Sequence, residues 1–355
     1  METQIVRFDP QTASRDAWAA YHRFRRARHE EHDPGDPILD DAAVEALLSR
    51  PDPTADAARF AALAPEGGFA GFLEVEVFKP GTPNEARNPD LAWFGLEVLV
   101  PHRGRGIGRA LLARAEAIAR RRGKGILGTW TDEPSGMGFL KRLDGRFAQR
   151  RRENRLRFAD VDWDLLRRWV EEGTARSPDT RLRWFGNRVD DDVLPEFAGA
   201  FTEVFNEQPF GDMAFRGLTF TPELVREHEA RIHESGGLSR IVVSQEPDGA
   251  ISALTEVTYH PTRRTMIGQG LTGVRSPYRG RGLGKWVKAA MLLRVREEFP
   301  DVAVVVTGNA SSNEAMLSIN ERMGFRLHRE AWVVDLSRDG VERYLENCGA
   351  RLPEA

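Results

Sequence analysis

Glycines and arginines gather at residues 274–285, in a pattern suited to binding an anion. The run Arg279-Gly280-Arg281-Gly282-Leu283-Gly284 follows an apolar, strand-like stretch and opens an amphipathic helix. Glycines let backbone N–H groups approach a phosphate closely, and a helix start offers unpaired donors with a partial positive charge. The stretch therefore predicts a phosphate cradle.

The same pattern occurs a second time, between residues 98 and 108. Arg103 aligns with Arg279 at an offset of 176 residues (279 − 103), and no gap separates the two copies. Each copy follows a strand-like run and precedes a helix. A fixed offset in a matching context predicts a duplicated domain.

The spacing of the glycines excludes two common phosphate loops. A dinucleotide-binding G-x-G-x-x-G needs a further glycine where Arg109 and Lys285 stand, and a P-loop needs Ser or Thr where Trp286 stands. The spacing that fits is R-x-x-G-x-G, in both copies. This resembles the pyrophosphate loop of the GNAT superfamily, the acyl-CoA-dependent N-acyltransferases.

The resemblance implies acetyl-CoA as co-substrate and a set of residues that bind it. In the second copy these are Thr272, Gly273, Val274, Arg279, Gly280, Arg281, Gly282, Leu283, Gly284, Asn309 and Asn313; in the first they are Val98, Arg103, Gly104, Arg105, Gly106, Ile107 and Gly108.

Composition sets further limits on function. The net charge of −3 argues against a nucleic-acid partner, and no apolar run approaches the roughly 20 residues of a membrane span. The N-terminus lacks the basic and apolar regions of a signal peptide, and Cys348 is the only cysteine. We therefore expect a cytoplasmic protein, a monomer or homodimer, without a metal, a membrane or a nucleic-acid partner.

The hydrophobic pattern predicts the same order of elements twice. In the first half we expect strands at 5–8, 57–64, 68–78, 91–100, 126–130 and 155–159, with helices at 17–29 and 136–143 and one after the first loop. The basic run 146–157 is interpreted as a solvated hairpin. In the second half we expect strands at 182–185, 239–244, 250–259, 265–274, 302–307 and 325–335, and helices at 193–205, from 221, at 282–299, 312–323 and 341–348.

These elements predict an α/β (α+β) protein of two tandem GNAT domains, each a mixed central sheet flanked by helices. We place the N-terminal domain at 1–160, a linker at 161–180 and the C-terminal domain at 181–355. In length and layout the chain resembles tandem GNAT enzymes of the mycothiol synthase type.

The resemblance is more specific in the second half. Asn309, Asn313 and Gly324-Phe325 are similar to the family's second cofactor segment, where a strand splays from its neighbour and leaves a cleft for pantetheine. Residues 130–147 of the first half lack this pattern. The C-terminal domain is therefore predicted to be catalytic, and the N-terminal domain degenerate.

Acyl transfer to an amine needs a proton acceptor, because alkylamines are mostly protonated near neutral pH. Glu256, in mid-strand before the loop, stands where the family often places its general base, and Glu97 is the weaker candidate in the first half. Many relatives place an acidic tyrosine where Asn320 stands here. Asn320 and Tyr278 are therefore the candidates that assist the departing thiolate.

The function predicted from the sequence is transfer of acetyl from acetyl-CoA to a primary amine of a small molecule. Cys348 lies outside the motifs, which favours direct attack in a ternary complex over an acyl-cysteine. Two alternatives remain open: a non-catalytic acyl-CoA-binding or sensor protein, and a protein N-acetyltransferase.

Overall fold

One twelve-stranded sheet runs through the whole molecule in the computed structural model, which describes residues 3–65 and 67–349. The strand order is β1-β2-β3-β4-β5-β12-β6-β11-β10-β9-β8-β7. The order reads as two matching sets of strands that meet at β12 and β6. The prediction of a mixed α/β fold built from two tandem units is confirmed.

The first half supplies β1 (Ile5–Phe8), α1 (Arg15–His32), α2 (Asp41–Ser49), β2 (Ala55–Leu63), β3 (Phe69–Phe78), α3 (Pro83–Arg87), β4 (Leu91–Val98), α4 (Ile107–Arg121), β5 (Ile126–Thr131), α5 (Pro134–Lys141) and β6 (Arg146–Arg157). The second supplies α6 (Trp163–Arg176), β7 (Arg181–Phe185), α7 (Leu194–Asn206), α8 (Pro222–Glu234), β8 (Leu238–Gln245), β9 (Ile251–Tyr259), β10 (Met266–Val274), α9 (Leu283–Glu298), β11 (Val304–Ala310), α10 (Glu314–Met323), β12 (Arg326–Ser337) and α11 (Arg338–Asn347).

Local signals account for most of these boundaries. Ser14 caps α1 by accepting the Ala17 N–H at 3.2 Å, and Thr221 caps α8 with proline at the first helical position. Strand β11 begins with three consecutive valines, which favour extended backbone.

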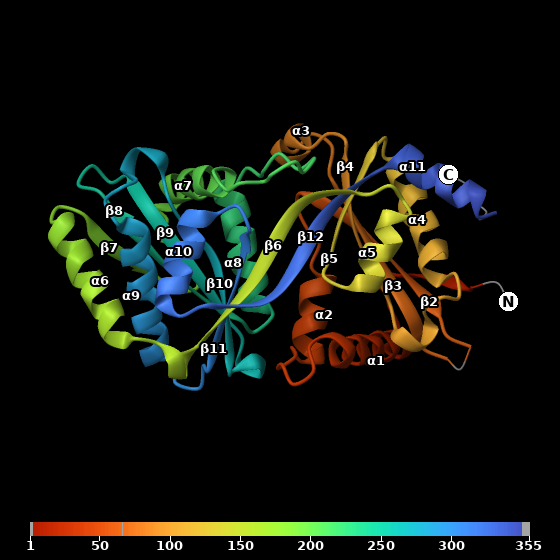
Figure 1. Cartoon of the computed structure of the whole chain (residues 1–355), viewed down its shortest axis with the longest axis horizontal. Helices are drawn as coiled ribbons and strands as arrows, with labels where there is room; N and C mark the ends of the chain where they lie inside the picture. The colour runs from red at the N-terminus through yellow and green to blue at the C-terminus, as the bar shows by residue number, and fades with distance from the viewer. Residues whose placement is uncertain (1–2, 66, 350–355) are drawn as a thin grey trace.

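The two halves exchange their last strands. Strand β6 pairs antiparallel with β11, where Glu153 faces Gly308, whereas β12 pairs antiparallel with β5, where Val333 faces Trp130. The two exchanged strands also pair with each other and cross the middle of the molecule side by side (Figure 1). The interpretation of 146–157 as a solvated hairpin is therefore wrong, because the segment is one continuous strand that joins the two halves. The predicted domain ranges stay a prediction, and β12 lies beside strands of the first range.

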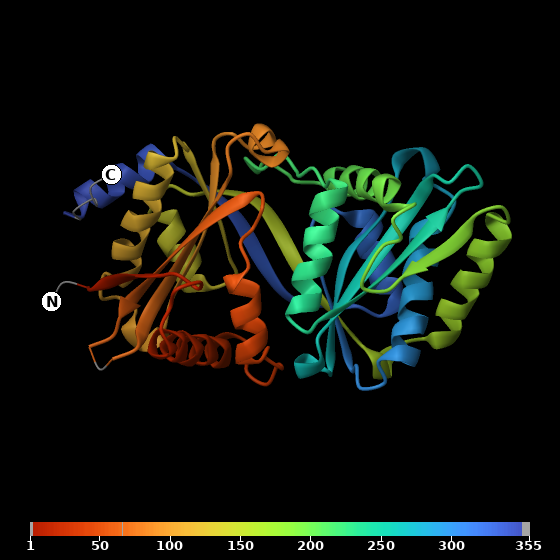
Figure 2. The ribbon, with the colours of Figure 1, turned by 180° about the vertical axis from the view of Figure 1, so that it is seen from behind.

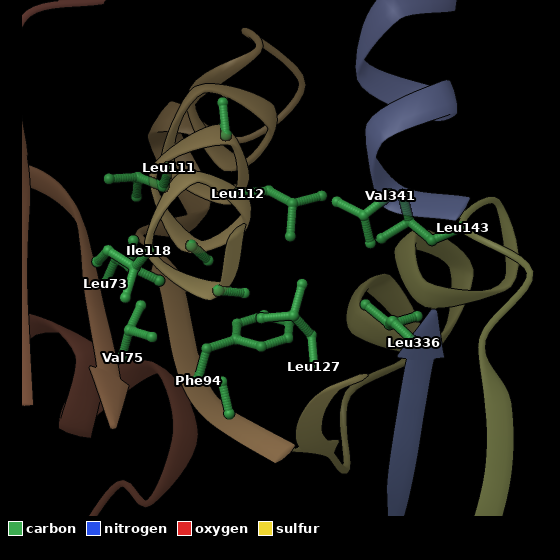
Figure 3. Packing of buried hydrophobic residues seen from close by; sticks show 14 of the residues in the cluster. Leu73, Val75, Phe94, Leu111, Leu112, Ile118, Leu127, Leu143, Leu336 and Val341 are labelled. Atoms are coloured by element: carbon green, nitrogen blue, oxygen red, sulfur yellow. The ribbon is translucent and has the colours of Figure 1, made fainter. Parts of the chain in front are cut away.

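The two hydrophobic cores also combine residues from both ends of the chain. The first core packs α4 on β3, β4 and β5 and takes Val334 and Leu336 from β12, with Val341 and Leu345 from α11 (Figure 3). The second packs α6 and α9 on β9, β10 and β11 and takes Leu156 from β6. Each half thus buries apolar side chains from the other end of the chain, so neither closes its core with its own sequence alone.

Helices α2 and α8 meet on the opposite side of the sheet from α9 (Figure 2). Arg50, which follows α2, pairs with Glu227 and Glu234 of α8. Together these helices cover part of the cleft described below. No helix in the described part of the chain is long and apolar enough to cross a membrane.

Candidate active site

Both glycine-arginine loops have the same backbone. In the first, Gly104 and Gly106 have φ of +74° and +83°; in the second, Gly280 and Gly282 have +84° and +83°. Gly106 and Gly282 are the N-caps of α4 and α9. Because L-residues rarely adopt this φ, glycine is needed at these turns. The predicted context of strand, loop and helix is present twice, and each loop leaves N–H donors at a helix start.

Carboxylates hold the arginines of the second loop. Glu207, at the end of α7, binds Arg279 at 2.7 Å and accepts the Ser276 N–H at 3.3 Å. Arg281 lies 2.9 Å from Glu246. These ion pairs hold the loop in place, and a phosphate bound here would compete with Glu207 for Arg279.

The two parallel strands beside this loop separate as they leave the core. Strands β10 and β11 pair from Met266–Val304 to Gln269–Thr307, and β10 then bulges between Gln269 and Thr272. A splayed strand pair exposes backbone N–H and C=O groups without a partner strand, which suits hydrogen bonding to an extended amide-bearing chain such as pantetheine. In the first half, β4 and β5 pair only from Leu91–Ile126 to Trp93–Gly128.

Glu256 of β9 faces the bulge of β10. Its carboxylate accepts the Leu271 N–H at 3.2 Å. Burial raises the pKa of the Glu256 carboxyl, and the charge of His228 on α8 opposes that rise. A raised pKa brings a carboxylate closer to the basicity that proton transfer from an amine requires. The geometry therefore suits the predicted base.

Gly270 leaves the space that Glu256 occupies. A Cβ at Gly270 would lie 2.6 Å from Oε1 of Glu256 and 2.7 Å from its Cγ. We expect Gly270→Ala to displace the carboxylate and lower kcat by roughly tenfold or more, because proton transfer depends on position. Gly268→Ala, where a Cβ would lie 3.1 Å from Oγ1 of Thr258 and 3.8 Å from its carbonyl oxygen, is the control. Steady-state rates of CoA release compare the two variants, and an equal effect from both would contradict this account.

Behind the splayed strands lies a buried polar chain that joins the predicted residues Asn309 and Asn320 to Lys288, which the sequence did not single out. Asn320 is 1 % exposed and donates from Nδ2 to Oδ1 of Asn309 at 2.8 Å. Lys288 of α9, also 1 % exposed, donates from Nζ to Oδ1 of Asn320. Burial lowers the pKa of the Lys288 ammonium to about 7. The available signal was a lysine four residues after Gly284, on the buried face of the helix.

The low pKa of Lys288 makes stability depend on pH. The unfolded chain keeps this lysine protonated up to a pKa of about 10.4, so between about pH 7 and 10 it binds more protons than the folded state. The contribution of Lys288 to the free energy of unfolding therefore rises with pH in this window. We expect Lys288→Met to reduce that rise in urea unfolding at pH 7 and pH 9. Equal pH dependence in both proteins would contradict a depressed pKa.

Other predicted residues have structural partners. Thr272 bonds Thr255 between hydroxyls at 2.7 Å, and Asn313 caps α10 by accepting the Met316 N–H at 3.3 Å. Gly273 allows close approach of α7, since a Cβ there would lie 2.3 Å from Cγ1 of Val204. Tyr278 packs against the second core.

A continuous cleft of about 2510 Å³ lies between the halves. It brings together Glu256, Thr272, Lys288, Asn309 and Asn313, and it also reaches the first loop at 103–109. Among the described residues, 275–284 of the second loop and Asn320 are not part of its lining. Within residues 3–65 and 67–349, no group of His, Cys, Asp and Glu side chains is arranged to hold a metal ion.

The first half has its own carboxylates at the equivalent face. Strand β3 corresponds to β9, because Gly71 pairs with Val98 in the first half as Ala253 pairs with Val274 in the second. Glu74 stands three residues after Gly71, and Glu256 stands three residues after Ala253. Glu74 is therefore the counterpart of Glu256. Burial, with the charge of Glu74, raises the pKa of Glu76 to about 7. Glu97 stands on the next strand, 3.6 Å from Nε of Arg28.

In the first half, Arg103 of the loop pairs with Glu133, which stands two residues after the end of β5. Its Nη1 lies 2.8 Å from Glu133 and donates to Oγ of Ser135 at 3.0 Å. The carboxylate of Glu133 thus occupies the arginine of the first loop, which disfavours an anionic ligand there.

Residues 17–144 match the model of the acetyltransferase (GNAT) family. The chain is also 35% identical over 99 residues to streptothricin acetyltransferase of Streptomyces lavendulae. That alignment covers 26% of this chain and 49% of the relative, so it spans about half the length of that protein.

Solved structures resemble the whole chain. A tandem GNAT protein from the clavulanic acid biosynthesis pathway has a TM-score of 0.74 at 18% identity, covering 95% of this chain and 99% of that one. A GCN5-related N-acetyltransferase from Sphaerobacter thermophilus has a TM-score of 0.63 at 16% identity, covering 94% and 95%.

The fold is therefore that of a tandem GNAT protein. Within it, residues 17–144 are the segment that matches the acetyltransferase (GNAT) family. The matched segment is the first half, whereas the sequence analysis placed catalysis in the second, and that assignment stays a prediction.

Proposed function

We propose that the protein is an acyl-CoA-dependent N-acetyltransferase that acts on a primary amine of a small molecule. The observation that carries this proposal is the position of Glu256, half-buried at the bulge of β10 beside the point where β11 splays away. In this arrangement the carboxylate takes the proton of the attacking amine, directly or through one water.

The second half is proposed as the catalytic one. The N–H groups at the start of α9 would hold the pyrophosphate, and the splayed strands β10 and β11 would hold the pantetheine arm. Backbone N–H groups beside the bulge would stabilise the oxyanion. Asn320, backed by Lys288, lies behind Asn309, where its chain of hydrogen bonds would polarise groups at the strand end.

Acyl transfer is proposed to be direct, from thioester to amine. Cys348, the only cysteine, caps the end of α11, which packs in the first core, whereas Glu256 lies on β9 in the second half. An acyl-cysteine intermediate would need a thiol at the splayed strands. A ternary complex of protein, acetyl-CoA and amine is therefore the proposed reacting species.

The experiment measures free CoA, with a thiol-reactive dye, from acetyl-CoA and a broad panel of small amines. Saturable release that depends on an amine is the expected result, and it would name an acceptor class at the same time. No release with any amine, together with saturable acetyl-CoA binding by calorimetry, would overturn the proposed activity in favour of a binding protein.

A further inference from the structure

The sheet face that carries Glu256 continues across the splayed strand into β6. A side chain at Gly270 of β10 would point at Glu256, and a side chain at Gly308 of β11 would point at Arg151 of β6. Nη2 of Arg151 lies 3.6 Å from the position of a Cβ at Gly308. Side chains of residues two apart share a face, so Arg151 and Glu153 are on this face with Gly308, which pairs with Glu153.

Arg151 carries an uncompensated positive charge. Its exposed side chain lines the cleft, and in the described part of the chain no carboxylate pairs with it. Glu153, its neighbour on the face, is engaged by Arg155 at 2.8 Å and by Arg329 at 3.4 Å. Because a guanidinium stays protonated in proteins, Arg151 keeps its positive charge in the cleft.

The fold does not require an arginine at this position. Strand β6 lies against β11 as β12 lies against β5: Arg152 faces Asn309, and Trp332 faces Thr131. The counterpart of Arg151 is therefore Ala331, one residue before Trp332. At this position a cation stands in the second half only, and the chain's first half supplies it through strand exchange.

We propose that Arg151 binds a carboxylate of the acceptor, so that the acceptor is an amine that also bears a carboxylate. This inference rests on the proposed function. The guanidinium offers two parallel N–H donors that match one carboxylate. On this face of the sheet, Glu256 of β9 and Arg151 of β6 flank the two splayed strands β10 and β11. Such an acceptor would present its amine to Glu256 and its carboxylate to Arg151.

The test uses amines of several sizes, each supplied as the free carboxylate, the carboxamide and the phosphonate. KM is measured from CoA release for the wild type, Arg151→Gln and Arg150→Gln. Arg150 is the matched control, because it is one residue away on the other face and pairs with Glu330. Thermal unfolding of each variant is recorded as well. Because Arg151 has no partner to lose, its variant should unfold at the wild-type temperature.

For the wild type we expect the carboxylate to have a KM roughly tenfold or more below that of its carboxamide, the size of one charge-assisted hydrogen bond. Arg151→Gln should remove this preference and leave the carboxamide KM unchanged, and Arg150→Gln should keep it. Two results would overturn the inference and leave the proposed function standing. One is a wild-type preference for carboxamides or phosphonates, and the other is a carboxylate preference that survives in Arg151→Gln. Silence with the whole panel overturns both.

Discussion

Glu256→Gln is expected to lower kcat by about 10²–10⁴-fold, the range that a positioned general base contributes. Glutamine has the same shape and can still accept the Leu271 N–H, so the bulge of β10 keeps its hydrogen bond. The amide cannot take a proton from the amine. CoA release gives the rate, and calorimetry should give an unchanged affinity for acetyl-CoA.

The pH profile separates a base from a structural carboxylate. Because burial raises the pKa of Glu256, the carboxylate form and the rate should both increase as pH rises through a value above the ordinary 4.5. The residual activity of Glu256→Gln should lack this acidic limb. If the variant turns over at the wild-type rate, Glu256 is not the base; Glu74→Gln, its counterpart on β3, is then the variant to compare.

The local elements of the fold could be predicted, because they depend on short patterns. Both loops, the helices that follow them and the β-branched strand β11 were visible as spacing and composition. The exchange of β6 and β12 was not, because a strand's sequence does not specify which sheet edge it joins. The arginines of β6 concealed the strand itself: at the junction the strand runs between two cores, and only its ends, such as Ala148 and Leu156, are buried.

Residues of the candidate site could be proposed from the sequence only where they stand at fixed distances from a motif. Glu256 could be found from the strand before the second loop. Glu74 was missed because the connection from β3 to β4 contains α3 and is longer than that from β9 to β10, so the offset between the copies changes there. Lys288 and Arg151 depend on tertiary contacts, and their roles appear only once α10 and β6 are in place.

Gly282→Glu is expected to weaken binding of CoA at the second loop by about 100-fold or more, the loss of one to two charge-assisted contacts. A Cβ there would lie 3.5 Å from Nη1 of Arg176 and 3.8 Å from Cε of Lys285. The new carboxylate would therefore draw these cations to itself and repel the pyrophosphate from the start of α9. Calorimetry with CoA measures the affinity and the number of sites.

Gly282→Asn separates charge from backbone strain, because asparagine tolerates the φ of +83° and adds no charge. It should retain most of the affinity that Gly282→Glu loses. Gly106→Glu makes the same change in the first loop, where Glu133 already binds Arg103. If the second loop is the cradle, only the change at Gly282 abolishes the tight site. If binding disappears with Gly106→Glu and persists with Gly282→Glu, the first half holds the acyl-CoA, and the proposed division of the two halves must be reversed.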